Sequence, residues 1–436
     1  MSAVLPISEL PFDLASASVP AIITELPGPE ARRMIERDQR VASPSMGRVY
    51  PLVPKRGAGM VIEDVDGNRF LDFNAGIAVT STGHCHPQVT AAIELQARTL
   101  LHYCSSDWYH PIYIELCERL AASAPVHDAR VFLANSGTEA VEASIKLARY
   151  STGRPDVIAF LGAFHGRSLG SLALTASKAK YRSGFGAPMA GVYHAPYGES
   201  GYIERVIFNH LADPGDIAAI VVEPIQGEGG YVVPPAGWLG ELRDLCTAHG
   251  IVLVADEVQS GVGRTGRMWA VEHEGIEPDV LLAGKGLASG LPLAAVIARG
   301  ELMRSWGPGK HGSTFGGNPV ACAAALATLD LIDESLAANA TRVGEHLQRG
   351  LADLQRRCPQ VREVRGRGLM IGIELESHAF AHEVEQAAFR RGLLVLTCGA
   401  AALRLAPPLV VTDTQAELAL TLLEAAISEV AQSSAV

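Results

Sequence analysis

Short apolar runs recur between residues 129 and 283, and each is too short for a helix. They carry no alternating polar face, which is typical of strands buried on both sides of a parallel sheet. Segments with helical spacing lie between them, as over residues 137–150. This alternation predicts an α/β fold with a mostly parallel sheet. The predicted strands are residues 129–134, 156–161, 217–222, 251–255 and 280–283.

The last third of the chain has a different pattern, in which long helical segments alternate with short strands. Helical spacing predicts helices over residues 320–333, 339–357 and 414–431. Near the N-terminus, residues 60–64 and 69–73 flank an Asp-Gly turn, which predicts a hairpin. We expect this hairpin to join the C-terminal elements in a smaller domain. The short strands expected there are residues 361–364, 369–375, 392–397 and 403–405.

These patterns divide the chain at two points. Residues 1–74 contain an arm and the hairpin, residues 75–330 form the large domain, and residues 331–436 supply most of the small domain. The arm covers residues 1–30 and is rich in Pro, Ser and Ala. Because it lacks the periodicity of a packed element, we expect it to lie on the surface or on a partner subunit.

Composition narrows the classes of function. The 436 residues are 48% hydrophobic and 19% charged, which supplies enough apolar sequence for two or three well-packed domains. The net charge of −11 argues against nucleic acid or an anionic membrane as a partner. No apolar run reaches the ~18 residues of a transmembrane helix, and the N-terminus shows no secretion signal.

The placement of cysteine and histidine indicates a reducing compartment and no metal site. Seven cysteines are scattered without a C-x-x-C pair, which favours free thiols in the cytoplasm. The cluster at residues 84–86 is His-Cys-His, but no second ligand group follows at zinc-like spacing. We therefore expect this cluster to be part of an ordinary loop.

Two charged residues at the ends of two predicted strands carry the most informative chemistry. Asp256 follows residues 251–255, and Lys285 lies between two glycines after residues 280–283. The carboxyl ends of strands in open α/β sheets face the ligand crevice, so we expect both side chains there. The Lys can form a Schiff base with pyridoxal phosphate, and the Asp can keep the pyridine nitrogen protonated. For this pair alone, an ion pair at the sheet edge is the simpler alternative.

A polar turn at Asn135-Ser136-Gly137-Thr138 precedes a strong helix. The free N–H groups and the positive dipole end at a helix start attract an anion such as phosphate. Plain N-capping by Ser136 or Thr138 would explain a single hydroxyl group. A phosphate site would explain the whole turn.

Other strand ends offer groups for a flat cofactor and for an acidic substrate. Phe164 can stack on a ring, and Arg167 can bind a carboxylate through two hydrogen bonds. Glu223 and Glu228 lie in a glycine-rich loop after residues 217–222 and are candidates for substrate contact. The simpler interpretations are a core aromatic residue, a solvated arginine and a surface turn.

Two motifs suggest other enzyme classes, but their contexts do not fit. Residues 261–266 match the dinucleotide pattern G-x-G-x-x-G, although residues 256–260 separate them from the preceding strand. Residues 166–170 match the nucleophile elbow G-x-S-x-G, yet residues 162–165 interrupt the required strand-to-turn connection. An NAD enzyme and a serine hydrolase are therefore weaker alternatives.

Taken together, these segments resemble the class III (ω-amino acid) aminotransferases of the pyridoxal-phosphate fold type I group. Within this class, the chain looks like the subgroup that holds the 4-aminobutyrate, ornithine and acetylornithine aminotransferases. The resemblance implies a large α/β domain with a mostly parallel seven-stranded sheet, plus a smaller α+β domain built from both termini. The matching motifs are residues 83–87, 135–140, 164–167, 223–230, 256–261, 284–286 and 313–319.

The resemblance also implies pyridoxal 5′-phosphate as the cofactor. Lys285 would be the Schiff-base lysine and proton carrier, and Asp256 would pair with the pyridinium nitrogen; both count as catalytic. Val258 and Phe164 would sandwich the ring, and Thr314 of a neighbouring subunit would complete the phosphate site. The implied cofactor-binding residues are Ser136, Gly137, Thr138, Phe164, His165, Glu223, Asp256, Val258, Gln259, Lys285 and Thr314.

On the substrate side, the resemblance assigns Arg167 to a substrate carboxylate. Glu228 would pair with Arg404, mask it for an ω-amine donor and release it for glutamate, so Glu228 also counts as catalytic. The loop around Ile77 would shape the donor pocket. These roles imply amino transfer from an ω-amino acid of the 4-aminobutyrate or ornithine type to 2-oxoglutarate, by a homodimer or a dimer of dimers.

Two alternatives stay open on the same fold. Acetylornithine could be the amino donor, because the sequence does not rank the donors. The chain could also be an amino-acid racemase, since Lys285 could return a proton to either face of the substrate. Residues 27–51 look closest to archaeal-type members, some of which act on ornithine and some as racemases. The complete pair of Lys285 and Asp256 disfavours a non-catalytic binding protein.

Overall fold

The computed structural model describes residues 14, 18–186 and 189–433. Its largest sheet has seven strands in the order β4-β10-β9-β8-β7-β5-β6. Of these strands only β10 is reversed in direction, pairing antiparallel with both β4 and β9, which confirms the mostly parallel seven-stranded sheet. The strands are β4 (Ala129–Ala134), β5 (Asp156–Phe160), β6 (Val192–Ala195), β7 (Ile217–Val222), β8 (Val252–Asp256), β9 (Val280–Ala283) and β10 (Ala294–Arg299).

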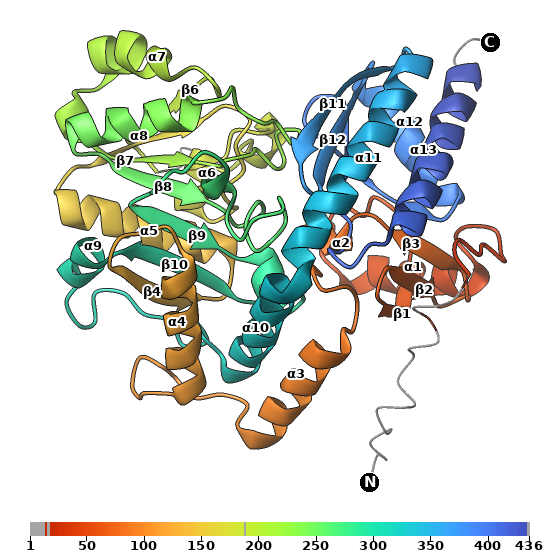
Figure 1. Cartoon of the computed structure of the whole chain (residues 1–436), viewed down its shortest axis with the longest axis horizontal. Helices are drawn as coiled ribbons and strands as arrows, with labels where there is room; N and C mark the ends of the chain where they lie inside the picture. Colours follow the sequence, from red (N-terminus) through yellow and green to blue (C-terminus); the bar gives the residue numbers. More distant parts are fainter. Residues whose placement is uncertain (1–13, 15–17, 187–188, 434–436) are drawn as a thin grey trace.

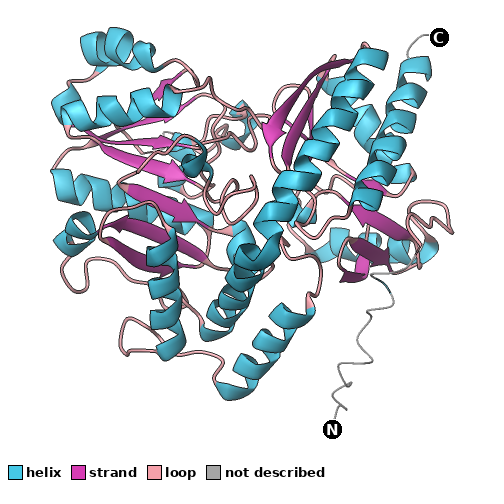
Figure 2. Cartoon of the chain, in the orientation of Figure 1, coloured by secondary structure: helices cyan, strands magenta, loops and turns pink. Residues whose placement is uncertain are grey.

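Both faces of this sheet are buried, which explains the continuous apolar runs. In β5, Ile158 and Phe160 face one hydrophobic core, and Val157 and Ala159 face another. Helices cover both faces, as Figure 2 shows. On the first face these include α8 (Trp238–His249) and α10 (Pro319–Leu331), and on the second α5 (Gly137–Thr152) and α6 (Leu169–Leu174).

The smaller lobe contains two four-stranded sheets where the sequence predicted one small sheet. The predicted hairpin is confirmed, because β2 and β3 pair antiparallel on either side of the Asp-Gly turn. β13 pairs in parallel with β3, so segments from both ends of the chain share a sheet. The first sheet holds β1 (Pro54–Ala58), β2 (Val61–Asp64), β3 (Arg69–Asp72) and β13 (Leu393–Leu394), and the second β11 (Val361–Arg367), β12 (Met370–Leu375), β15 (Ala402–Leu405) and β14 (Leu396–Cys398).

Long helices complete the small lobe and connect it to the large one. α10 is followed through a π-helical turn, Ile332–Leu336, by α11 (Ala337–Arg357), and together they cross from one lobe to the other (Figure 1). We propose domain boundaries near residues 74 and 330, the second of which falls in this crossing. The other helices are α1 (Pro29–Val41), α2 (Ala75–Ala78), α3 (Pro87–Thr99), α4 (Pro111–Ser123), α7 (Ser200–Tyr202), α9 (Gly300–Ser305), α12 (His378–Arg390) and α13 (Asp413–Ser433).

The N-terminal arm is only partly within the described residues. Its described portion lies on the small lobe, where Ala21 forms a β-bridge with Arg69. The side-chain oxygen of Asn68 accepts hydrogen bonds from the backbone of Ile23 and Thr24. This part of the arm therefore lies on the surface of its own chain, and its predicted contact with a partner subunit stays a prediction.

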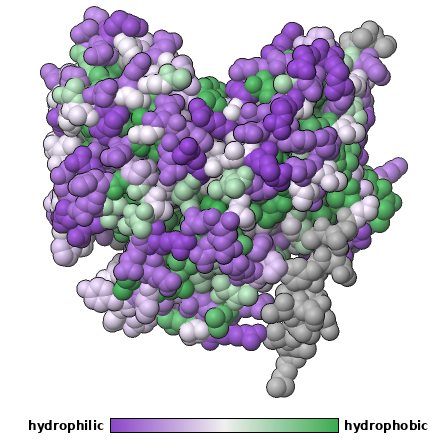
Figure 3. Space-filling view, in the orientation of Figure 1, coloured by the Kyte–Doolittle hydropathy of each residue, from purple (hydrophilic) through white to green (hydrophobic). Residues whose placement is uncertain are grey.

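The outer surface on the face shown in Figure 3 is mostly hydrophilic, as the composition of the chain predicts. This face is indented between the two lobes (Figure 3). Over the described ranges, none of the helices has the length and apolar character needed to cross a membrane.

Candidate active site

A cavity of about 410 Å³ lies at the carboxyl ends of the central strands. The ends of β5, β7, β8 and β9 and the start of α5 surround it, as expected for an open α/β sheet. The structure thus brings together residues that are far apart in the sequence. The predicted site residues that line the cavity are Ser136, Gly137, Thr138, Phe164, His165, Arg167, Glu223, Asp256, Val258, Gln259 and Lys285.

The other predicted residues lie outside this lining. Glu228 and Arg404 form an ion pair with each other. Ile77 is 43% exposed on a turn next to the lining residue Val79. Thr314 is exposed on the loop before α10 and does not line the cavity of its own chain.

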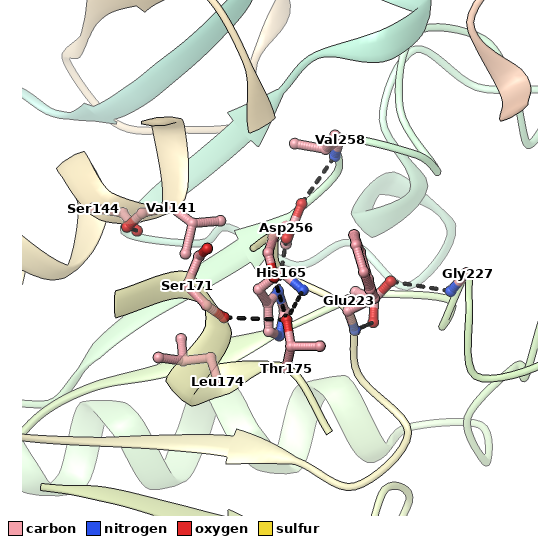
Figure 4. A network of polar contacts seen from close by, with 12 residues as sticks. Val141, Ser144, His165, Ser171, Leu174, Thr175, Glu223, Gly227, Asp256 and Val258 are labelled. Atoms are coloured by element: carbon pink, nitrogen blue, oxygen red, sulfur yellow. Dashed lines mark hydrogen bonds and ion pairs between the residues drawn. The ribbon is translucent and has the colours of Figure 1, made fainter. Parts of the chain in front are cut away.

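Asp256, at the end of β8, is fixed by two hydrogen bonds (Figure 4). His165 Nδ1 lies 2.7 Å from Asp256 Oδ2, and the Val258 N–H donates to Asp256 Oδ1 at 3.1 Å. The backbone N–H of His165 in turn donates to Thr175 Oγ1 at 3.0 Å. Burial would lower the pKa of His165, but the hydrogen bond and the charge of Asp256 outweigh it and raise that pKa. The pair therefore presents an oriented, hydrogen-bonded carboxylate to the cavity.

Glu223 is a second buried acid on the next strand. Its carboxylate accepts hydrogen bonds from the backbone N–H groups of Gly227, at 3.0 Å, and Phe164, at 3.1 Å. Burial raises its pKa from 4.5 to about 7, although the charge of His165 acts in the opposite direction. Glu223 therefore ties together two loops that line the cavity.

Lys285 follows β9 and lines the cavity with a partly exposed side chain. Desolvation lowers the pKa of its amine, and the nearby charges of Asp256 and Glu223 only partly oppose this. Within the described part of the chain, no hydrogen bond or ion pair engages its Nζ. Its backbone has φ of +41°, a left-handed conformation that is costly for a residue with a side chain. The fold thus holds, in a fixed position, an amine whose pKa is lowered by desolvation.

The start of α5 offers an anion site at the same cavity. Ser136 is the N-cap residue and accepts a hydrogen bond from the Glu139 N–H at 3.4 Å. The backbone N–H groups of Gly137 and Thr138 belong to the first turn, where a helix supplies no acceptor. The Thr138 hydroxyl lies 2.7 Å from Ser168 Oγ and 2.6 Å from Ser171 Oγ. The backbone N–H groups are therefore free for an anion, and the Thr138 hydroxyl is shared with two serines.

Glycines let the walls of the cavity approach each other closely. A Cβ on Gly137 would lie 2.9 Å from Val258 Cγ1, and one on Gly284 would lie 3.2 Å from the same atom. Val258 is thus packed between the start of α5 and the end of β9. Its side chain forms one wall of a narrow site, and Phe164 contributes to the lining from the end of β5.

Glu228 is held at both carboxylate oxygens. Oε2 accepts from Arg404 Nη1 at 3.0 Å, while Oε1 accepts from Lys178 Nζ and from the Tyr181 hydroxyl, each at 3.0 Å. The side chains of Arg404 and Glu228 are 6% and 15% exposed. Burial alone would raise the pKa of Glu228, but the charges of Arg404 and Lys178 lower it below its ordinary value. Glu228 is therefore an ionised group with two cationic partners.

Arg167 is placed by aromatic rings close to this group. Its guanidinium carbon lies 4.7 Å from the centre of the Tyr181 ring and 5.9 Å from that of Phe164. Tyr181 therefore contacts both Arg167 and Glu228. The site holds two arginines, one stacked on rings and lining the cavity, and one paired with an acid.

Gln259 is oriented by a buried tyrosine. The Tyr231 hydroxyl donates to Gln259 Oε1 at 2.9 Å, and this leaves the side-chain NH₂ to donate elsewhere. A Cβ on Gly227 would lie only 2.2 Å from Gln259 Nε2, so the glycine-rich loop packs directly against this amide. Burial raises the pKa of Tyr231 to about 12, so its hydroxyl keeps its proton.

The turn that carries Ile77 is strained. Four consecutive residues, 75–78, have φ between +51° and +69°, which makes a single left-handed turn where the sequence predicted a loop. Asp72 fixes its start, because Oδ1 accepts from the backbone N–H groups of Asn74 and Ala75 and Oδ2 lies 2.7 Å from His84 Nε2. His84 is therefore a structural residue next to this turn. No group of His, Cys, Asp and Glu in the described ranges could hold a metal ion.

Comparison with known proteins identifies the family. The family described as aminotransferase class-III matches residues 42–427. The chain is a class-III aminotransferase. An alanine/serine racemase from Pyrococcus horikoshii is 38% identical to it over 98% of this chain and 96% of its own. The 4-aminobutyrate aminotransferase of Mycobacterium leprae is 40% identical over 90% of this chain and 94% of its own. Ornithine aminotransferase from Toxoplasma gondii, in a structure with partially occupied pyridoxal phosphate, has a TM-score of 0.86 at 33% identity and covers 94% of this chain and 96% of its own.

Class-III aminotransferases use pyridoxal phosphate, and the cavity fits this group. An amine of lowered pKa, Lys285, and an oriented carboxylate, Asp256, lie at one cavity with the open N–H groups of α5. These are the groups that an aldehyde, a pyridine nitrogen and a phosphate require. Phe164 and Val258 line the same narrow space, as a flat ring requires.

Some lining residues of this aminotransferase were not predicted from the sequence. The segment after Lys285 contributes a Gly-Leu-Pro-Leu loop, in which Gly290 has a φ of +135°. Such a turn directly after the lysine strand was a usable signal that the sequence analysis did not include. The lining residues without a predicted role are Val79, Gly166, Gly290, Leu291, Pro292 and Leu293, whereas Asn135 belongs to the turn predicted to bind phosphate.

Proposed function

We propose that this chain transfers the amino group of an ω-amino acid, of the 4-aminobutyrate or ornithine type, to 2-oxoglutarate and so forms glutamate. The observation that carries the proposal is the buried pair of Glu228 and Arg404 beside a cavity that also holds Arg167. Relatives named for 4-aminobutyrate and acetylornithine transamination support the same class of donor.

The two substrates of such an enzyme place different charges beside the reacting carbon. Glutamate has a carboxylate there, whereas an ω-amine donor has an uncharged carbon. A bare Arg404, only 6% exposed, would be costly next to an uncharged group because a buried cation needs a partner. Glu228 supplies that partner for the donor and gives way to the carboxylate of glutamate. Arg167 holds the distal carboxylate of both substrates.

The remaining residues have roles around the reacting carbon. When bound, pyridoxal phosphate supplies an electron-withdrawing ring that stabilises negative charge on the substrate carbon next to nitrogen. Lys285, whose lowered pKa favours the neutral amine, takes a proton from that carbon and returns it. Asp256, oriented by His165, favours a protonated ring nitrogen. Phe164 and Val258 confine the ring, and Gln259 donates to the ring hydroxyl.

We propose a homodimer or a dimer of dimers, with Thr314 completing the phosphate site of the neighbouring subunit. The exposed position of Thr314 supports this, since its hydroxyl is not used in its own cavity. An exposed apolar surface lies beside it, where the rings of His102 and Phe315 are 5.0 Å apart and Tyr103 and Trp108 are 4.5 Å apart. Such a surface supports an interface. The seven cysteines are all free, which supports a cytoplasmic location.

A panel of amino donors tests the proposed function. The purified enzyme is incubated with 2-oxoglutarate and 4-aminobutyrate, ornithine, acetylornithine or lysine, and the glutamate formed is measured. We expect at least one ω-amino acid to give glutamate with the kcat/KM of a physiological substrate. Failure of every donor in the panel would contradict the proposal.

Racemisation is a second candidate, because the Pyrococcus horikoshii racemase aligns with 98% of this chain. Lys285 alone could exchange the proton without loss of the amino group. Incubation of a single L-amino acid without a keto acid separates the two functions. Loss of chirality without formation of a keto acid would favour the racemase.

A further inference from the structure

Besides Arg404, Glu228 has two further partners, which take no part in the proposed replacement of Glu228 by a substrate carboxylate at Arg404. Its Oε2 faces Arg404, whereas its Oε1 accepts from Lys178 and Tyr181, each at 3.0 Å. The Lys178 side chain is 23% exposed and its charge helps to keep the pKa of Glu228 low. The acid is therefore shared between two cations, and only one of them faces an incoming carboxylate.

The segment that carries Lys178 is anchored independently of Glu228. Ala176, two residues earlier, donates its N–H to Ala163 O at 2.8 Å and accepts from the Gly162 N–H at 3.2 Å. Tyr181 closes a turn by donating its N–H to Lys178 O at 3.1 Å. Lys178 and Tyr181 are thus held in place before any rearrangement of Glu228.

The main chain around Glu228 is also fixed. The Gly399 N–H donates to Glu228 O at 2.8 Å. A Cβ on Gly227 would lie 2.2 Å from Gln259 Nε2, and one on Gly229 would lie 2.6 Å from Gly162 O. The glycines of this loop therefore serve close packing, and any movement of Glu228 away from Arg404 is confined to its side chain.

We propose that Lys178 is the positioning residue that keeps Glu228 paired and ionised when a substrate carboxylate takes Arg404. The inference rests on the proposed function and deepens it, because it identifies what stabilises the open state of the pair. Without Lys178, opening would leave a buried carboxylate with only the Tyr181 hydroxyl, which is costly. With Lys178, the carboxylate pivots about Oε1 and exchanges its partner only at Oε2. Lys178 thus favours ligands with two carboxylates over ligands with one.

Binding of unreactive ligands to the holoenzyme tests this inference. Glutarate carries two carboxylates and pentanoate carries one on a chain of the same length, and neither has an amino or keto group. We expect Lys178→Met to weaken the Kd of glutarate by roughly tenfold, because a charged hydrogen bond to the opened acid is lost. The Kd of pentanoate, which leaves Arg404 paired, should change by less than about twofold. Isothermal titration calorimetry gives both constants.

Two matched variants separate a local electrostatic role from a structural one. Lys178→Arg keeps the charge and should restore glutarate binding to near the wild-type value. Lys180 belongs to the same segment, and its ammonium group lies 5.6 Å from the centre of the Tyr181 ring. Lys180→Met removes this charge and should leave the preference for glutarate unchanged. An unchanged glutarate Kd in Lys178→Met, or an equal loss for both ligands, would overturn the inference.

Steady-state kinetics add a second readout, because they separate the KM for 2-oxoglutarate from kcat. Lys178→Met should raise the KM for 2-oxoglutarate while kcat with the ω-amine donor stays near that of the wild type. This outcome is independent of the test of the proposed function, which asks whether the wild-type enzyme forms glutamate. If glutamate forms and the preference for glutarate does not depend on Lys178, the inference fails and the function stands. If the preference depends on Lys178 and no donor yields glutamate, the function fails.

Discussion

The two ends of the active site are built differently. At the ring end, His165, Asp256 and Glu223 are buried, and their hydrogen-bond partners come from neighbouring strand ends and loops. At the carboxylate end, Glu228 contacts Arg404 on one side and Lys178 on the other. The first end has one arrangement of partners, whereas at the second end Glu228 lies between two cations, and we propose that it exchanges one of them for substrate.

This difference follows from what each end has to bind. The ring end receives the same cofactor in every turnover, so a fixed set of buried partners gives orientation. In the proposed function, the carboxylate end receives two substrates in turn, one with and one without a charge beside the reacting carbon. A buried arginine can be used with both substrates only if an acid of the protein pairs with it whenever the substrate carboxylate is absent. We therefore expect substitutions at the ring end to affect both half-reactions, and those at the carboxylate end to separate them.

Removal of Lys285 should have the largest effect and should not distinguish the substrates. Lys285→Ala lacks the amine that lines the cavity, and we expect both half-reactions to slow by at least about 10⁴-fold. The attachment of the cofactor to the chain, measured as an adduct fixed by borohydride reduction, should also be lost. A borohydride-fixed adduct in this variant would show that another lysine performs the role.

Substitution of Asp256 should come next. Asp256→Asn keeps the shape and a hydrogen-bonding group beside His165, so the cofactor should still bind. The neutral amide no longer favours a protonated ring nitrogen, and we expect both half-reactions to slow on the order of 100-fold. Single-turnover rates measured with each substrate provide the check, and rates close to wild type would exclude the assigned role.

A smaller effect, on cofactor affinity, is expected at the predicted contact between subunits. Thr314→Ala removes one hydroxyl group from the phosphate site of the neighbouring subunit, which should weaken cofactor affinity by roughly tenfold. Equilibrium dialysis of the cofactor gives the Kd. Unchanged affinity, or a structure in which each phosphate is held within one chain, would contradict the shared site.

A further effect concerns stability rather than rate and tests whether the partners of Glu223 are as fixed as described. The pKa of Glu223 is raised from 4.5 to about 7, so the folded chain binds this proton more tightly than the unfolded chain. Stability should therefore fall as pH rises from about 4.5 to 7 and level off above that, by on the order of 1–3 kcal/mol. Glu257 has a similarly raised pKa and contributes with the same sign, so a matched variant is needed.

Glu223→Gln supplies that comparison because it keeps the shape and removes the titration. Denaturant midpoints at pH 5 and pH 8 should differ less in this variant than in the wild type. Equal differences in the two proteins would mean that Glu223 titrates near its ordinary value.

The ring end was largely predictable from the sequence because its residues follow apolar strands directly. Asp256, Glu223 and Lys285 each lie within a few residues of a buried run, and the structure brings all three to one cavity. β6 and β10 were not among the predicted strands. β6 is an edge strand with mixed burial, so its sequence shows no continuous apolar run. β10 does carry such a run, so its sequence was sufficient to predict this strand.

The carboxylate end was predictable only in part. The sequence suggested the pairing of Glu228 with Arg404 through a family resemblance, and the structure shows the two side chains in contact. Lys178 and Tyr181 gave no signal, because they lie on a non-periodic segment 50 and 47 residues before Glu228. The glycines around Glu228 suggested flexibility, whereas the structure shows close packing at Gly227. Contacts made by loops across such separations depend on the whole fold.

The most direct test of the exchangeable end is a comparison of the two half-reactions in Glu228→Ala and Arg404→Ala. Single-turnover rates are measured for each variant with the ω-amine donor and with glutamate. In Glu228→Ala the unpaired Arg404 should slow the donor half-reaction by roughly 100-fold and the glutamate half-reaction far less. In Arg404→Ala the order should be reversed, since glutamate loses its carboxylate partner. Equal slowing of both half-reactions in both variants would contradict the account and leave the pair with a structural role.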